Sequence, residues 1–157
     1  MHINEVVPFF AVKDMVRSVS FYVDGLGFEI TARWEPEGRL RWCRLQRGDA
    51  GLMLQQFKTE GHDARTFSEN KGEGVSLMFM CDDAIGYYRE LKERGLDASE
   101  PQVSNALWVT DVRDPDGYRL SFEAPTDVSE GTKLSEWEND ACVGYVQRVL
   151  PAWTRRP

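Results

Sequence analysis

The sequence predicts an α+β domain of two tandem βαβββ repeats, forming a curled mixed sheet, with a C-terminal helix after the second repeat. The first observation is an apolar, strand-like stretch that ends in an Asp and occurs twice, as VPFFAVKD at residues 7–14 and as VSLMFMCD at residues 75–82. The second is the helical pattern that follows each stretch. Each pattern ends 13 positions beyond that Asp, at Gly27 or Gly95, where a left-handed backbone costs little.

A third observation links the second halves of the two repeats. In each half a tryptophan lies nine positions before a glycine, Trp42 before Gly51 and Trp108 before Gly117. Both glycines belong to turn-like tetrapeptides, GDAG and DPDG, of the kind that joins two strands. The residues after each glycine alternate between two faces, as expected of a strand.

The first repeat is expected to span residues 5–57. It contains a helix at 14–26 and strands at 5–12, 28–34, 39–47 and 51–57. Asp14 is the expected N-cap, because its short carboxylate can accept from the free amides of the first helical turn. The polar, glycine-containing residues 58–73 read as the linker between the repeats.

The second repeat is expected at residues 74–125 and completes a domain of residues 1–125. It contains a helix at 82–94, capped by Asp82, and strands at 74–81, 97–102, 106–113 and 118–123. Asp114 and Asp116 are expected to hold the DPDG turn through their side chains.

Residues 126–157 form a C-terminal extension with a helix expected near 135–150. Ser135 and Glu138 match an S-x-x-E capping box, and Pro151 would end the helix.

Composition narrows the class of protein. The formal net charge of −7 argues against nucleic acid as a partner, because counterion release requires a basic surface. No apolar run approaches the roughly 20 residues of a membrane span, and the N-terminus does not resemble a signal peptide. Three widely spaced cysteines, Cys43, Cys81 and Cys142, fit a reducing compartment. We therefore expect a cytoplasmic protein with neither nucleic-acid nor membrane partners.

Two segments carry a resemblance to a known family. VPFFAVKDMVRSVSFYVDGLGF and DPDGYRLSFEAP are similar to the opening and closing segments of the vicinal oxygen chelate superfamily, which includes glyoxalase I, extradiol dioxygenases and bleomycin-resistance proteins. The resemblance covers about residues 5–125. It implies four metal-ligand positions, which fall here on Val7, Gln55, Val75 and Ser121. Valine cannot coordinate a metal, and Gln and Ser are weak neutral donors, so we expect no metal and no other cofactor.

The resemblance is greatest to the metal-free, bleomycin-resistance-like branch. It implies a homodimer that sequesters a small-molecule ligand, planar or cationic, such as an antibiotic, in an aromatic-walled cup. The expected ligand-binding residues are three possible aromatic walls, two floor residues and two charged groups near the mouth: Trp34, Trp42 and Trp108; Gln55 and Ser121; Arg119 and Glu123. The sequence leaves open whether Trp42 and Trp108 instead pack in the core on the helix side of the sheet.

A second hypothesis is an enzyme. Most characterised relatives are enzymes, so a metal-dependent lyase, isomerase or dioxygenase-like activity remains the alternative. It would require an atypical metal site, assembled from Glu123, Gln55 and His62, the last from the linker.

Overall fold

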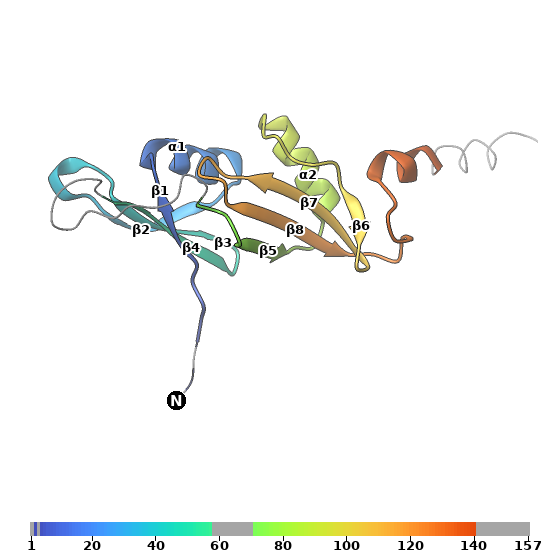
Figure 1. Cartoon of the computed structure of the whole chain (residues 1–157), viewed down its shortest axis with the longest axis horizontal. Helices are drawn as coiled ribbons and strands as arrows, with labels where there is room; N and C mark the ends of the chain where they lie inside the picture. The colour runs from blue at the N-terminus through green and yellow to red at the C-terminus, as the bar shows by residue number, and fades with distance from the viewer. Residues whose placement is uncertain (1, 3, 58–70, 141–157) are drawn as a thin grey trace, which may run out of the picture.

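The computed structural model describes residues 2, 4–57 and 71–140, which form two four-stranded mixed sheets (Figure 1). The first sheet has the order β1-β4-β3-β2, and the second has the order β5-β8-β7-β6. The strands are β1 (Phe9–Val12), β2 (Glu29–Trp34), β3 (Trp42–Arg47), β4 (Ala50–Gln56), β5 (Ser76–Met80), β6 (Gln102–Ser104), β7 (Leu107–Arg113) and β8 (Arg119–Pro125). The expected α+β fold is confirmed. His62, Cys142, Pro151 and the expected helix beyond residue 140 lie outside the described residues.

Each sheet is one βαβββ repeat with the same connections. The first strand of the repeat pairs in parallel with the last, β1 with β4 and β5 with β8, and the other pairs are antiparallel. The helical crossover in the first repeat is α1 (Met15–Ser20), followed by one π-helical turn at Phe21–Gly25, and in the second it is α2 (Ala84–Glu93). A short 3-10 turn, Pro36–Gly38, precedes β3. None of the helices described has the length and apolar character needed to cross a membrane.

In the two repeats, the helices begin and end as the sequence predicts, with one correction. The Asp14 carboxylate accepts from the Arg17 amide at 3.1 Å, as expected of an N-cap. In the second repeat the cap is Asp83 rather than Asp82, and it accepts from the Gly86 amide at 2.8 Å. Asp82 and Asp83 both have a carboxylate that could cap the helix. Asp83 is the N-cap because its backbone is extended, as an N-cap residue requires. Left-handed glycines follow both helices, as expected.

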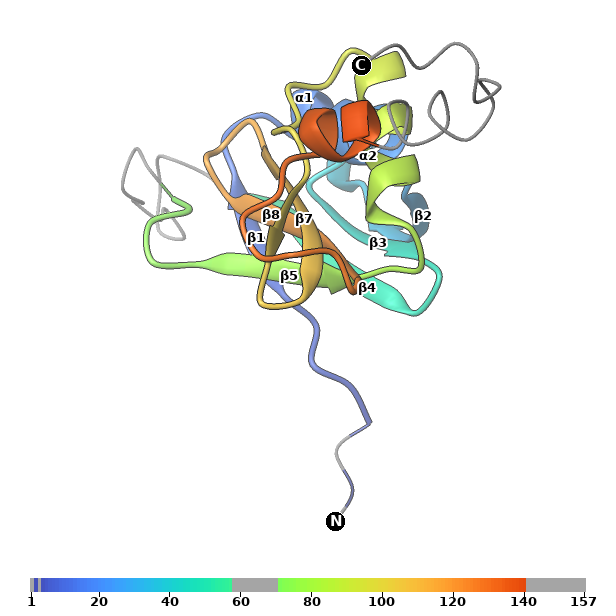
Figure 2. The same ribbon diagram turned by 90° about the vertical axis from the view of Figure 1, so that its right-hand side faces the viewer.

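The helices and one face of each sheet enclose a shared core, as the two views indicate (Figures 1 and 2). Alternate strand residues point into this core because successive side chains of a strand face opposite sides. They include Phe10, Val12, Leu52 and Leu54 of the first repeat and Leu120 and Phe122 of the second. The Phe10 ring stacks on Tyr118, with 3.9 Å between ring centroids, so the two repeats share one core. No helix of residues 4–57 or 71–140 covers the other face of either sheet (Figures 1 and 2).

Asp114 holds the DPDG turn, as predicted. Its carboxylate accepts from the amides of Asp116 (2.9 Å) and Tyr118 (2.8 Å). It also accepts from the Tyr22 hydroxyl at 3.0 Å and so links the turn to the first repeat. Burial raises the pKa of Asp114, and these hydrogen bonds oppose that shift.

Asp116 ties the repeats together more directly than the sequence suggested. Its buried carboxylate accepts from the Lys13 amide at 3.1 Å and pairs with Lys71 at 3.2 Å, where both side chains are nearly inaccessible. Breaking a buried ion pair is costly because the remaining charge is left uncompensated in an environment that water does not solvate.

We expect Asp116→Asn to lower the free energy of unfolding by about 3 kcal/mol, since the amide cannot replace the charge opposite Lys71. Urea denaturation at neutral pH measures the change. Asp82→Asn, an exposed position that caps no helix, is the matched control and should shift unfolding by less than about 0.5 kcal/mol. Equal urea midpoints for the two variants would contradict this role of Asp116.

The C-terminal helix begins at residue 134, and its capping differs from the expected box. The Lys133 amide donates to the Glu136 carboxylate at 3.2 Å, whereas Glu138 pairs with Arg89 of α2. Ser135 therefore lies inside the first turn. The start is shifted because Leu134 is buried against the second repeat, a contact that the sequence pattern cannot show.

Candidate functional site

The helix-free face of the second sheet carries a polar patch. On β8, the residues Arg119, Ser121 and Glu123 alternate with core residues and so share this face. On β7, Asp111 is paired with Ser121, and Val109 is paired with Glu123. The strand register thus brings acidic, hydroxyl and guanidinium groups together on two adjacent strands.

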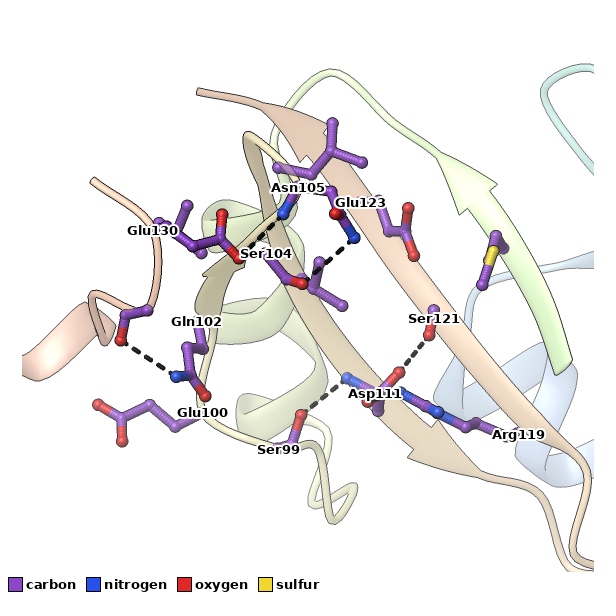
Figure 3. Close-up of a pocket in the computed structure, with 15 residues that line it drawn as sticks. Ser99, Glu100, Gln102, Ser104, Asn105, Asp111, Arg119, Ser121, Glu123 and Glu130 are labelled. Carbon is purple, nitrogen blue, oxygen red and sulfur yellow. Dashed lines mark hydrogen bonds and ion pairs between the residues drawn. The ribbon is translucent and has the colours of Figure 1, made fainter. Parts of the chain in front are cut away.

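A cavity of about 610 Å³ lies over this patch (Figure 3). Strands β7 and β8 form its floor, and Met78 of β5 lies at one side. The segment before β6, the β6–β7 hairpin and the C-terminal extension complete its lining, through Glu100, Asn105 and Glu130 among others. Its size lies within the range of small-molecule sites.

The cavity is strongly acidic. Four carboxylates line it, from Glu100, Asp111, Glu123 and Glu130, against one cation, Arg119, which gives a formal charge of −3. Arg119 is already paired with Asp111 at 2.7 Å. The hydrogen bond that Arg119 donates to Asp111 and the nearby negative charges raise the pKa of Arg119, so it stays protonated. Among the described residues that line the cavity, no cation offsets the remaining three carboxylates.

Glu123 is the most unusual of these groups. Only 9% of the residue is exposed. Among residues 2, 4–57 and 71–140, its carboxylate accepts no hydrogen bond and forms no ion pair. The neighbouring Ser121 hydroxyl donates to Asp111 instead. The carboxylate oxygens themselves are not sealed in the core, so at the floor of a cavity this group is ready to receive a positively charged partner.

Of the residues expected at the site, Arg119, Ser121 and Glu123 come together, but Trp34, Trp42 and Gln55 lie elsewhere. Trp34 is paired with Trp42, and Trp42 with Gln55, in one row across the first sheet. This row lies on the helix-free face of that sheet, and Trp34 is 55% exposed. None of the three lines the cavity of the second sheet.

Trp108 corrects one expectation. It is buried on the helix side of its sheet and packs edge-on against Trp137, with 6.0 Å between ring centroids, so Trp42 and Trp108 are not opposed walls. The equal spacing to glycine was misleading. Gly51 lies inside β4, whereas Gly117 lies in the longer turn between β7 and β8. A change in hairpin length by an odd number of residues reverses the face that a side chain takes.

The register also changes the internal alignment of the repeats. The core pairs Phe10–Leu54 and Phe79–Phe122 are equivalent, which makes Gln55 the counterpart of Glu123 rather than of Ser121.

No group of three or more His, Cys, Asp or Glu side chains in the described ranges is arranged to hold a metal ion. His62, which the enzyme hypothesis required, lies outside those ranges.

Sequence reasoning missed Glu100, Asp111 and Glu130. A signal existed for Asp111, since residues 107–113 alternate and place it on the face of Leu107 and Val109, opposite Trp108. Glu100 and Glu130 had no such signal, because they enter the site from irregular segments that tertiary packing brings together.

The fold and the cavity define a class: small α+β domains of paired βαβββ repeats that present a ligand-sized cavity on the helix-free side of a sheet. A family model described as Glyoxalase/Bleomycin resistance protein/Dioxygenase superfamily matches residues 2–122. The chain belongs to this superfamily.

Solved structures with the same fold include several whose titles refer to antibiotics. One is TnmS3, an antibiotic binding protein from Streptomyces sp. CB03234, with a TM-score of 0.58, 23% identity, and coverage of 80% of this chain and 99% of that one. Another is a bleomycin-binding protein complexed with bleomycin, with a TM-score of 0.60, 22% identity, and coverage of 78% and 98%. A third is a bleomycin resistance determinant encoded on the transposon Tn5, with a TM-score of 0.61, 22% identity, and coverage of 80% and 100%. At these identities the likeness establishes the fold. No curated protein sequence matched this chain.

Proposed function

We propose that this protein binds a cationic small molecule in the cavity over β7 and β8 and sequesters it, without a metal and without changing it chemically. The observation that carries the proposal is Glu123, a largely buried residue whose carboxylate lines a cavity of charge −3 and has no hydrogen-bond or ion-pair partner among the described residues. The net charge of −7 would attract a cation over a longer range. Similar structures named as antibiotic-binding and bleomycin-binding proteins make antibiotics a reasonable first class of ligand, and we place this protein in the cytoplasm.

A homodimer would supply the aromatic part of the site. Large apolar side chains are exposed on the helix-free faces of both sheets, including Phe9 and Trp34 on the first and Met78 and Met80 on the second. Such faces usually meet a partner. In such a dimer, the Trp34–Trp42 pair of one copy would lie against the acidic cavity of the other. A planar cation would then contact both an aromatic wall and a carboxylate, whereas in the described residues of one chain the tryptophan pair and the cavity are apart.

Isothermal titration with two cationic probes, bleomycin and the planar dye proflavine, tests the proposal. We expect at least one cation to bind in the micromolar range or tighter, with affinity falling as salt rises because exposed charge attraction is screened. The planar anion fluorescein is the control and should not bind. Equal binding of anion and cations would overturn the proposal. A tightly held equivalent of Zn, Ni, Mn or Fe in elemental analysis would favour the metal-dependent enzyme instead.

A further inference from the structure

We propose that the cation received by Glu123 is a tertiary ammonium group, which offers one N–H to the carboxylate and N-alkyl groups to the apolar side chains around it. This inference rests on the proposed function of the same cavity and names the chemistry of its ligand. It depends on which side chains surround Glu123, whose carboxylate lines the cavity (Figure 3).

The strand register fixes the immediate neighbours of Glu123. On the helix-free face, Glu123 lies between its register partners, Val109 of β7 and Met80 of β5. Paired residues of adjacent strands lie about 5 Å apart. Along β8, its neighbours on the same face are Ser121 and Pro125, because residues two apart in a strand share a face. Three of these four neighbours are apolar.

Two further apolar side chains extend this surrounding. Met78 of β5 is paired with Ser121, and Leu107 of β7 is paired with Pro125. Both line the cavity, and Met78 is 68% exposed. An unbranched methionine side chain adapts its shape to what it contacts. We call the following set the apolar ring: Met78, Met80, Leu107, Val109 and Pro125.

Acceptors for a cation with several N–H groups are scarce beside Glu123. Within the described strands, Ser121 is its one polar register neighbour, and the Ser121 hydroxyl donates to Asp111. Asp111 also accepts from Arg119 at 2.7 Å. A primary ammonium group has three N–H donors, and each donor that leaves water without a new acceptor costs free energy. A tertiary ammonium group has one such donor, which Glu123 alone satisfies.

The carboxylate in turn favours a cation that keeps one N–H. Its oxygens are open to the cavity, and among the described residues they accept no hydrogen bond. A hydrogen bond between two charged groups is about twice as strong as one between neutral groups. A quaternary ammonium group has the charge but no donor, so it loses this bond. The N-alkyl groups of a tertiary cation gain contact with the apolar ring, because apolar area leaves water.

Calorimetric titration of the full chain at neutral pH with naphthylethylamine and its N,N-dimethyl and N,N,N-trimethyl derivatives tests this inference. The three probes share one aromatic group and one positive charge, so they differ in N–H donors and methyl groups. We expect the dimethyl probe to bind about tenfold tighter than the primary amine, since two methyl groups are buried. It should also bind about fivefold tighter than the trimethyl probe, which cannot donate.

Val109→Thr is the variant that addresses the apolar ring. Threonine keeps the branched shape of valine but places a hydroxyl acceptor beside Glu123, so the preference for the dimethyl probe over the primary amine should fall several-fold. Met78→Gln adds an acceptor from β5 at an exposed position and serves as the second variant if Val109→Thr lowers stability. Val16→Thr, the same exchange at an exposed position of α1 outside the cavity, is the matched control and should keep the wild-type preference.

Three equal affinities, or tightest binding of the primary or the trimethyl probe, would overturn the inference. A preference left unchanged by both Val109→Thr and Met78→Gln would also overturn it. In either case Glu123→Gln, which should weaken every probe, shows that the proposed function still holds. If no probe binds the wild type, the proposed function itself fails.

Discussion

Glu123→Gln is expected to weaken the binding of a cationic ligand by about 30-fold to several thousand-fold. Removing one member of a buried, hydrogen-bonded charge pair at an interface costs roughly 2–5 kcal/mol, and each 1.4 kcal/mol is tenfold in affinity. Glu123 is positioned for such a pair, because it is 9% exposed at the cavity floor, between Val109 of β7 and Met80 of β5. Calorimetric titration with the cationic probe that binds best measures the loss.

The same substitution should change the free energy of unfolding of the unliganded protein by less than about 0.5 kcal/mol. Gln has the shape of Glu, and among the described residues the Glu123 carboxylate makes no hydrogen bond or ion pair that the amide would lose. Glu93→Gln, an exposed position on α2, is the control and should change neither property. A Glu123→Gln variant that binds cations as tightly as the wild type would show that the ligand does not use this carboxylate.

Trp108→Ala and Trp34→Ala are expected to have opposite consequences. Trp108 is 6% exposed and packs against Trp137 and Leu134, so its truncation should lower the free energy of unfolding by about 4 kcal/mol. Trp34 is 55% exposed on the first sheet, so its truncation should cost the folded chain less than about 1 kcal/mol. Urea denaturation compares the two variants.

The two substitutions should affect dimer formation in the opposite way to stability. Light scattering of the wild type is expected to give twice the chain mass of 18.0 kDa, and Trp34→Ala should shift the protein toward one chain mass. Folded Trp108→Ala should keep the dimer, because that side chain lies inside its own subunit. A monomeric wild type, or a dimer that Trp34→Ala leaves intact, would show that the tryptophan row is not the interface.

Local sequence patterns are sufficient to predict the architecture. The duplicated strand–helix pattern, Asp14 as an N-cap and the left-handed glycines after each helix all depend on residues close together in the chain. Alternation along β8 also placed Arg119, Ser121 and Glu123 on one face before any contact was known. Such features follow from local backbone geometry, which the order of residues specifies.

Only the tertiary structure decided which surfaces meet. Trp108 lies in the core on the helix side of its sheet, whereas Trp42 lies on the helix-free face of the other sheet. Strand register depends on hairpin length, and a one-residue change in register moves every side chain of the strand to the other face. The tertiary structure separated Gln55 from Ser121, and it brought Glu100 and Glu130 to one cavity from segments with no periodic pattern. A binding site joins groups that are distant in sequence, so its membership is set by packing between elements rather than by the spacing of residues along the chain.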